Sequence, residues 1–98
     1  MEVEFDDDDL DRLETDPQFT AKWAREIVRG FRKVVQSIRS ASDERDLFAS
    51  RGLHFERMKG NRSHQHSLRI NKQWRLIVEI RGTAPSKRIG VVGIEDYH

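Results

Sequence analysis

The last residues of the sequence bring together several kinds of side chain that can transfer a proton. Glu95 and Asp96 supply carboxylates, Tyr97 supplies a phenol and His98 supplies an imidazole. Histidine titrates near pH ~6.5 and tyrosine near ~10, so these groups can accept or donate a proton around neutral pH. With arginine or lysine nearby to neutralise a phosphate, they are the parts of a ribonuclease that needs no metal.

Three further histidines are candidates for chemistry, and the chain contains no cysteine. His64 and His66 have the spacing of metal ligands on a strand, but no third ligand is evident, so we expect no metal site. His54 stands shortly before Lys59-Gly60 and could serve as a catalytic base. The lack of cysteine excludes disulfides, thiolate metal sites and thiol nucleophiles.

Helices are predicted in the first half of the chain. Four aspartates at positions 6–9 precede Leu10, as at a helix start, where the helix dipole favours acids. Asp16-Pro17 is a second start signal, because aspartate caps helices and proline suits their first turn. A long helix is therefore expected over about 17–40, with one apolar stripe formed by Phe19, Trp23, Ile27, Phe31, Val34, Val35 and Ile38.

A second short helix is expected between Ser42 and Gly52, after which the pattern changes to the alternation of strands. The strand-like stretches are 64–70, 74–80 and 88–94, and residues 2–5 could form a further short strand. No connection between these stretches is long enough for a parallel crossover. The sequence therefore predicts one α+β domain over residues 1–98, with two N-terminal helices packed on an antiparallel sheet.

The connection between the first two of these strands decides which side chains share a face. A three-residue loop, 71–73, places Leu68 opposite Leu76 and Arg69 opposite Arg75, whereas a two-residue loop would mix apolar and polar partners. The leucine face then meets the long helix, and the other face carries the arginines and Ile77. Opposed arginines repel, so they either splay into solvent or bind an anion.

Charge is divided unevenly along the chain. Residues 1–16 carry nine acids and one base, a balance of −8, whereas residues 17–98 carry 17 bases and eight acids, a balance of +9. The body of the domain is therefore a candidate binder of polyanions such as nucleic acid. No run approaches the roughly 18 apolar residues of a membrane span and the start lacks a secretory pattern, so a cytoplasmic protein is expected.

Several of these segments together resemble the HigB branch of the RelE/ParE toxin superfamily. The matching segments are Leu53-His54-Phe55, Met58-Lys59-Gly60-Asn61-Arg62, Ser67-Leu68-Arg69-Ile70-Asn71, Gln73-Trp74-Arg75 and the terminal Asp96-Tyr97-His98. The acidic opening and residues 43–47 extend the resemblance over nearly the whole chain. It implies a small α+β domain with two N-terminal helices on an antiparallel sheet, the architecture that the periodicity also predicts.

The resemblance implies a toxin of a type II toxin-antitoxin pair that acts without a metal or cofactor. Such toxins cut messenger RNA in the ribosomal decoding site, and a helix-turn-helix antitoxin of the HigA type restrains them and provides their only route to operator DNA. The ribose 2′-hydroxyl attacks the adjacent phosphorus, so the protein must move protons and neutralise the developing charge.

The resemblance also assigns catalytic roles. His98 is expected to transfer a proton, Asp96 to orient it or act as a second acid-base group, and Tyr97 to donate a proton or stack on a base. The catalytic histidine of this branch lies nearer the Lys-Gly pair than His54 does, at the place where this chain has Glu56. His54 is therefore a catalytic candidate displaced along the chain.

Four cations match the RNA-binding positions of the family. Lys59 and Arg75 are expected to hold the scissile phosphate, with Arg62 and Arg69 as helpers. Two other functions stay open: a ParE-like toxin that binds gyrase without catalysis, and a weakly active toxin that acts mainly in autoregulation. The terminal acid-base residues argue against the first, and the displacement of His54 keeps the second open.

Overall fold

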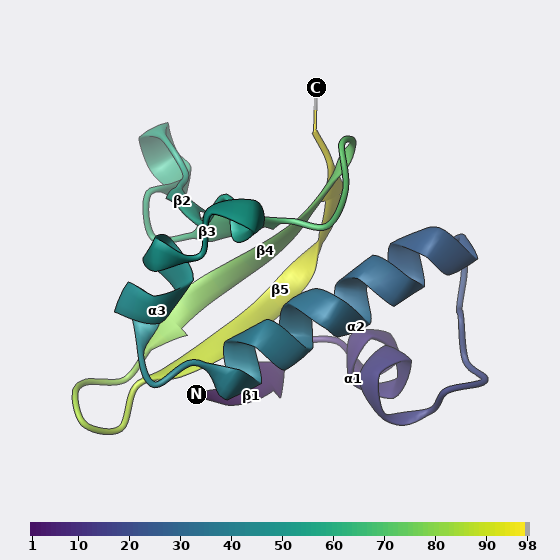
Figure 1. The fold of residues 1–98 in the computed structure, drawn as a ribbon, viewed down its shortest axis with the longest axis horizontal. Coiled ribbons are helices and arrows are strands. Elements are labelled where there is room, and N and C mark those ends of the chain that lie inside the picture. The colour runs from purple at the N-terminus through teal and green to yellow at the C-terminus, as the bar shows by residue number, and fades with distance from the viewer. Residues whose placement is uncertain (98) are drawn as a thin grey trace.

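The structure is a computed structural model that describes residues 1–97. Its helices are α1 (Asp8–Thr15), α2 (Arg25–Ser40) and α3 (Glu44–Ala49), with the short 3₁₀ turns η1 (Arg51–Leu53) and η2 (Gly60–Arg62). Its strands are β1 (Glu2–Phe5), β2 (Glu56–Arg57), β3 (His66–Arg69), β4 (Trp74–Arg81) and β5 (Arg88–Asp96). Figure 1 shows α2 lying across β4 and β5. The predicted α+β architecture is therefore confirmed.

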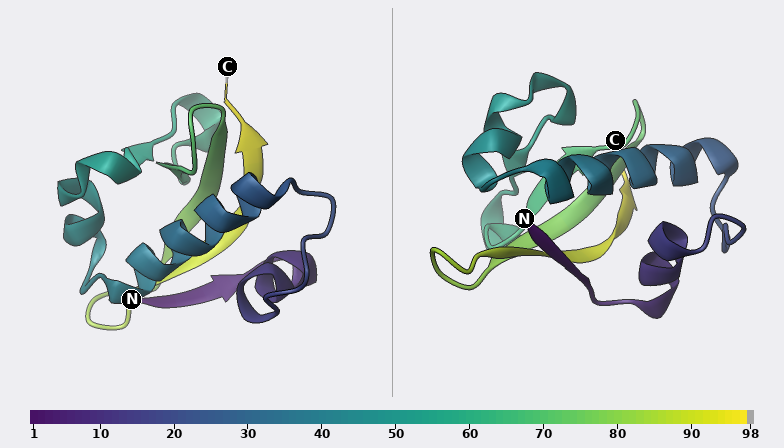
Figure 2. Two further views of the ribbon diagram at one scale, coloured as in Figure 1. Left: turned by 45° about the vertical axis from the view of Figure 1, so that its right-hand side comes forward. Right: turned by 60° about the horizontal axis from the view of Figure 1, so that its bottom comes forward.

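The strands form one sheet in the order β1-β5-β4-β3-β2. Strands β3, β4 and β5 pair antiparallel, as predicted, and the unpredicted β2 pairs antiparallel with β3. By contrast, β1 pairs parallel with β5, with Val3 opposite Ile89. The sheet is therefore mixed rather than purely antiparallel. The argument from short connections did not apply to β1, because nearly the whole chain lies between it and β5 and supplies the crossover. Figure 2 shows β1 and β5 side by side in two further views.

The long helix begins later than predicted, at Arg25 instead of near Pro17. The Asp16 carboxylate accepts a hydrogen bond from the backbone N–H of Gln18 at 3.0 Å and so closes a local turn. Ala21 then adopts a left-handed φ of 51°, which a right-handed helix does not contain. The predicted cap signal is thus used by a loop, and residues 17–24 lie outside the helix.

The apolar stripe of α2 packs on the sheet as predicted. Its buried members are Ile27, Phe31, Val34, Val35 and Ile38. Phe19 and Trp23 also pack against the core, but from the loop that precedes the helix. A Cβ at Gly30 would lie 2.7 Å from Cγ2 of Ile70. Glycine at this position therefore allows α2 to approach the end of β3 closely.

Two aspartates begin the short helices. The Asp7 carboxylate accepts a hydrogen bond from the Asp9 N–H at 2.7 Å and caps α1, at the acidic run that predicts a helix start. The Asp43 carboxylate accepts from the Arg45 N–H at 2.9 Å and caps α3. The second predicted helix is therefore confirmed, although it ends at Ala49, before Gly52.

The predicted register between β3 and β4 is confirmed, with Leu68 opposite Leu76 and Arg69 opposite Arg75. The three-residue loop is held by Asn71, whose side-chain oxygen accepts hydrogen bonds from the backbone N–H groups of Gln73 (2.9 Å) and Trp74 (2.8 Å). Each leucine is fully buried against α2. The two arginines therefore lie on the opposite face of the sheet, which α2 leaves uncovered.

Far from the C-terminal end of β5, this uncovered face is held together by ion pairs around Arg81. Its guanidinium contacts the carboxylates of Glu4 (2.8 Å), Asp6 (2.8 Å) and Glu79 (2.9 Å). A Cβ at Gly90 would lie 2.2 Å from Cζ of Arg81, so the missing side chain leaves room for the guanidinium above β5. Arg81 thereby connects β1 to β4 across β5.

The two histidines with metal-ligand spacing have different neighbours. His66 is buried and stacks on Phe55 with ring centroids 4.7 Å apart, whereas His64 lies 3.8 Å from the Glu79 carboxylate. Among residues 1–97, no group of three or more metal-ligating side chains comes together. No helix in the described chain is both long and apolar enough to cross a membrane.

Candidate active site

A pocket of about 290 Å³ lies on the uncovered face, at the C-terminal end of β5. Its lining contains four residues that the sequence predicts for the site: Lys59, Arg75, Asp96 and Tyr97. The other lining residues are Glu56, Arg57, Met58, Ser67, Ile77 and Glu95. Segments from β2, β3, β4, β5 and the residues after β2 therefore meet at one hollow.

The end of β5 is placed beside β4 by backbone pairing. Asp96 is opposite Trp74, and the Tyr97 N–H donates a hydrogen bond to the Gln73 carbonyl at 2.5 Å. The Gln73 side-chain amide also donates to Oδ2 of Asp96 at 3.1 Å. The loop between β3 and β4 thus holds both the backbone and one carboxylate of the C-terminal segment. His98 lies outside the described residues.

Arg75 and Tyr97 form a stacked pair in this pocket. The guanidinium carbon of Arg75 lies 4.3 Å from the centroid of the Tyr97 ring, a cation–π contact. The Nη1 atom of Arg75 is buried and has no hydrogen-bond partner among residues 1–97. An unmet buried donor costs about 1–3 kcal/mol, so a ligand oxygen that displaces the atoms covering this nitrogen and accepts its hydrogen bond would remove that cost. Tyr97 is 55% exposed and leaves its ring accessible for further stacking.

The opposite wall of the pocket comes from β2 and the residues that follow it. The Met58 N–H donates to the Gln65 carbonyl at 2.9 Å, which ties this segment to the start of β3. Lys59 follows Met58 and is exposed, so its ammonium can move to meet an anion. Ile77 lies on the predicted face but is only 1% exposed, because the pocket walls cover it.

Arg62, a predicted phosphate-binding helper, is paired instead with a carboxylate. Its guanidinium donates to both oxygens of Glu95, at 3.0 and 2.6 Å, and to the Gln65 side chain at 3.0 Å. The hydrogen bonds that Arg62 donates to Glu95 raise the pKa of Arg62 above its ordinary value. Arg62 does not line the pocket, and its charge is neutralised at the rim.

Arg69 and His54 also lie outside the pocket lining and contact each other. Nη1 of Arg69 is 3.4 Å from Nε2 of His54. The Nε of Arg69 donates a hydrogen bond to the Asn71 carbonyl at 3.4 Å. His54 adopts a left-handed φ of 47° at the end of η1. Arg69 and Arg75 are opposite each other, as predicted, but their guanidinium groups turn to different partners and avoid repulsion.

Unlike His54, Glu56 lines the pocket and brings a carboxylate to it. It occupies the position at which the sequence departs from the resembled family, and it pairs with Ser67 at the edge of the sheet. The alternation of β2 and β3 could have identified it, but β2 contains only two residues, too few for a periodic pattern. Arg57 lies on the same two-residue strand and escapes sequence reasoning for the same reason. Glu95 is among the terminal carboxylates named from the sequence, but its pairing with Arg62 depends on tertiary structure.

Comparison with known proteins gives the family. Residues 3–87 match the family model described as RelE-like toxin of type II toxin-antitoxin system HigB. This match covers the helices and most of the sheet, and ends before β5 and the C-terminal motif. Among curated proteins, no match was found.

Solved structures with the same fold include toxins alone and in complex. The YoeB/ParE toxin from Agrobacterium tumefaciens aligns with a TM-score of 0.61 and 18% identity, over 100% of both chains. The YoeB-YefM complex from Staphylococcus aureus aligns with a TM-score of 0.59 and 18% identity, over 100% of this chain and 97% of that one. The heterotetrameric YoeB-YefM toxin-antitoxin complex from the same organism aligns with a TM-score of 0.57 and 20% identity, with the same coverage. At these identities the likeness establishes the fold, and the family model establishes membership: this chain belongs to the HigB-like toxins, RelE-like toxins of type II toxin-antitoxin systems.

Proposed function

We propose that this toxin is an endoribonuclease that cuts messenger RNA on the ribosome by metal-free acid-base catalysis. The observation that carries the proposal is the buried Nη1 of Arg75, which has no partner among residues 1–97 and lies in one pocket with Lys59, Asp96 and Tyr97. A cationic donor beside a carboxylate and a phenol suits a reacting phosphodiester. The family of the chain supports the same reading.

The phosphate is held by cations in this proposal. Arg75 is fixed by its stack on Tyr97 and donates from Nη1 to a phosphate oxygen, which satisfies the unmet donor. Lys59, exposed on the opposite wall, closes on a second oxygen. Both contacts strengthen as negative charge develops on the phosphorus, so they stabilise the transition state more than the ground state.

The bond changes need one group to accept a proton and one to donate it. The 2′-oxygen forms a bond to phosphorus and loses its proton, while the bond from phosphorus to the 5′-oxygen breaks and that oxygen gains a proton. Asp96, held by Gln73, and Glu56 are the carboxylates in the pocket that can take part. His98 is proposed from the sequence as the main proton-transfer group, with Asp96 orienting it.

Tyr97 can hold an RNA base next to the phosphate site. Its ring is 55% exposed and is already stacked on one side by Arg75. Stacking on an aromatic ring contributes about 1–3 kcal/mol per base and tolerates any sequence. The pocket is nevertheless small, about 290 Å³, and offers little to align a flexible strand. A ribosome that presents ordered messenger RNA would supply this alignment and would place the toxin in the cytoplasm.

The test is cleavage of a defined messenger RNA with and without ribosomes, with both new ends mapped. We expect a 2′,3′-cyclic phosphate and a 5′-hydroxyl, formed only with ribosomes. Arg75→Ala should lower the rate about 10²–10³-fold, as removal of an oxyanion donor does elsewhere, and Lys59→Ala should also lower it. Arg45→Ala is the control, because Arg45 is exposed and pairs with Asp43 on α3. Undiminished cleavage by Arg75→Ala contradicts the proposal, and DNA breaks with intact messages would instead indicate gyrase binding.

We further propose a helix-turn-helix antitoxin as the partner of this toxin and as its link to operator DNA. The proposal is supported by the family of the chain and by the two structural neighbours that are toxin-antitoxin complexes. Co-purification of the toxin with the product of an adjacent gene would test it.

A further inference from the structure

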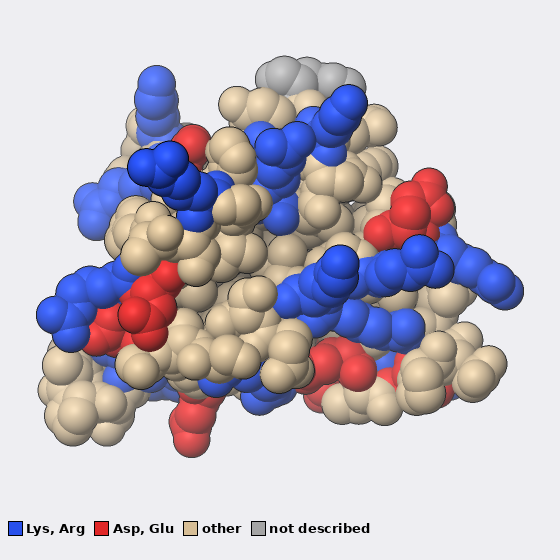
Figure 3. All heavy atoms as spheres, in the orientation of Figure 1, with Lys and Arg blue, Asp and Glu red and all other residues tan. Residues whose placement is uncertain are grey.

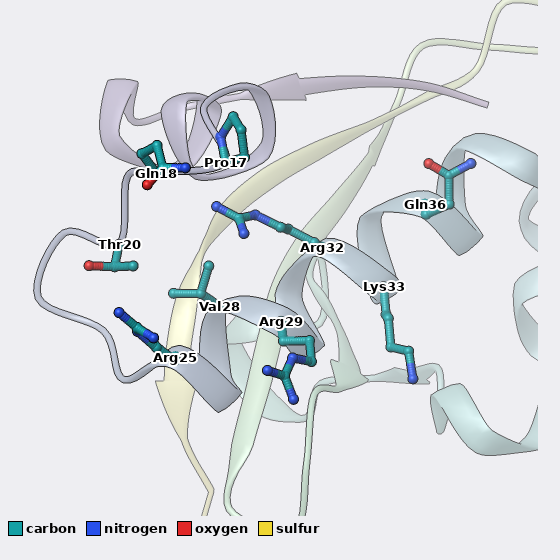
Figure 4. Close-up of a pocket in the computed structure, with 9 residues that line it drawn as sticks. All are labelled: Pro17, Gln18, Thr20, Arg25, Val28, Arg29, Arg32, Lys33 and Gln36. Atoms are coloured by element: carbon teal, nitrogen blue, oxygen red, sulfur yellow. The ribbon is translucent and has the colours of Figure 1, made fainter.

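A second hollow in the described chain lies away from the candidate active site, between α2 and the loop that precedes it. Its volume is about 540 Å³. Arg25, Arg29, Arg32 and Lys33 line it, and we call it the α2 groove. Because α2 packs on the leucine face of the sheet, the sheet separates this groove from the pocket at Arg75. Figure 4 shows its side chains.

One cation of the α2 groove has a structural role. Arg32 donates hydrogen bonds to the backbone carbonyls of Leu13 (2.8 Å), Asp16 (3.1 Å) and Phe19 (3.2 Å). In Figure 4 it reaches from α2 toward Pro17. These bonds fix the loop beside the helix, so the groove has two anchored walls.

The other three cations have no such role. Within residues 1–97, neither an ion pair nor a side-chain hydrogen bond is formed by Arg25, Arg29 or Lys33. They follow one another at intervals of four residues, a spacing at which like charges on a helix repel. Arg25 also lies in the first turn, where the helix dipole disfavours a cation. Their arrangement therefore opposes helix stability, and an anionic partner would reverse that effect.

Elsewhere in the described chain, many arginines are already neutralised. Arg62 pairs with Glu95, Arg39 with Glu14, and Arg81 with three carboxylates. The α2 groove is thus a place where positive charge is left unmatched. Figure 3 shows lysine and arginine side chains forming a band over α2, with acidic side chains bordering it.

From these observations we propose that the α2 groove binds an acidic, amphipathic segment of a protein partner. The unpaired cations attract carboxylates, and the exposed Pro17 gives the groove an apolar surface that a leucine-like side chain can contact. The groove chemistry stands independently of catalysis. If the protein is the toxin proposed above, the antitoxin is the expected partner; only this identification rests on the proposed function.

A protein segment fits this groove better than RNA does. Among the residues that line it there is no aromatic side chain on which a base could stack, in contrast to Tyr97 in the active-site pocket. A long polyanion would also meet the acidic side chains that border the band, whereas a short segment need not.

Two labelled probes test the proposal: a 12-residue peptide of glutamate and leucine, and a 12-nucleotide single-stranded RNA. We expect the peptide to shift the backbone amide NMR signals of residues 17–36, with affinity that falls as salt rises. Arg29→Glu should weaken peptide binding about tenfold, because reversal removes an attraction and adds a repulsion. Lys33→Glu should act in the same direction, and replacing the leucines of the peptide by serine should also weaken it.

Arg51→Glu is the matched control, since Arg51 is also exposed and lies on η1, outside the groove. It should change peptide affinity by less than about twofold. Equal binding by Arg29→Glu and Arg51→Glu would overturn the proposal, and so would RNA that shifts residues 17–36 as strongly as the peptide does. Messenger RNA cleavage by Arg29→Glu separates this proposal from the proposed ribonuclease activity. Arg29 lies outside the active-site pocket, so the variant should cleave at the wild-type rate.

Discussion

At the scale of single residues, the candidate site depends on how Arg75 is held. Its stack on Tyr97 fixes the guanidinium, and Nη1 is buried with no hydrogen-bond partner among residues 1–97, so one donor is unsatisfied. Arg62 has the same side chain, but both of its ends are occupied by Glu95 and Gln65. Residue type alone therefore does not decide which arginine can bind phosphate, and the surrounding acceptors do.

Gln73 gives a prediction at this scale, since its side chain holds the Asp96 carboxylate at 3.1 Å. Gln73→Ala should leave the thermal stability unchanged. It should lower the cleavage rate by up to about tenfold, which corresponds to the free energy of one hydrogen bond. Single-turnover cleavage with saturating ribosomes measures this. Lys72→Ala is the control, because Lys72 is exposed in the same loop. A wild-type rate for Gln73→Ala would mean that Asp96 needs no such orientation.

At the scale of elements, the fit of α2 on the sheet depends on Gly30. A Cβ there would lie 2.7 Å from Cγ2 and 3.1 Å from the carbonyl oxygen of Ile70. The backbone oxygen cannot move aside without disturbing β3, so Gly30→Ala should destabilise the protein by about 1–3 kcal/mol despite the better helix propensity of alanine. Urea unfolding measures this. Gly52→Ala, with nothing within 4 Å of its Cβ, should have little effect, and equal stability of both variants would contradict the argument.

Sequence reasoning succeeded where local rules and tertiary packing agree. The loop at 71–73 followed from the requirement that Leu68 and Leu76 share a face, and the structure confirms it. The start of α2 did not follow, because Asp16 can cap a turn as well as a helix and only the path of the loop decides between them. Likewise, Arg62 and Glu95 are 33 residues apart, and no pattern along the chain indicates their pairing.

At the scale of the whole molecule, the acidic N-terminal segment and the basic body are joined by ion pairs. Arg81 binds Glu4 and Asp6 from the acidic segment, and Arg39 binds Glu14. The uneven charge of the sequence is therefore partly used to attach β1 and α1 to the rest of the fold. In the α2 groove, by contrast, Arg25, Arg29 and Lys33 form no ion pair within residues 1–97.

This joining makes stability depend on acid pH in a direction that can be derived. Hydrogen bonds from Arg81 lower the pKa of Glu4, Asp6 and Glu79 below their ordinary values of 4.5, 3.8 and 4.5. Carboxylates with lowered pKa stabilise the fold above their unfolded pKa, and this contribution is lost as pH falls through the folded pKa. Urea midpoints should therefore decline gently below about pH 6.5, because burial lowers the pKa of His66, and steeply below about pH 4.5, where the carboxylates of the Arg81 ion pairs become protonated. Arg81→Met should unfold more easily at pH 7 but converge with wild type near pH 3, whereas Arg51→Met should follow wild type throughout. Parallel curves for Arg81→Met and wild type would show that these ion pairs do not hold β1 in place.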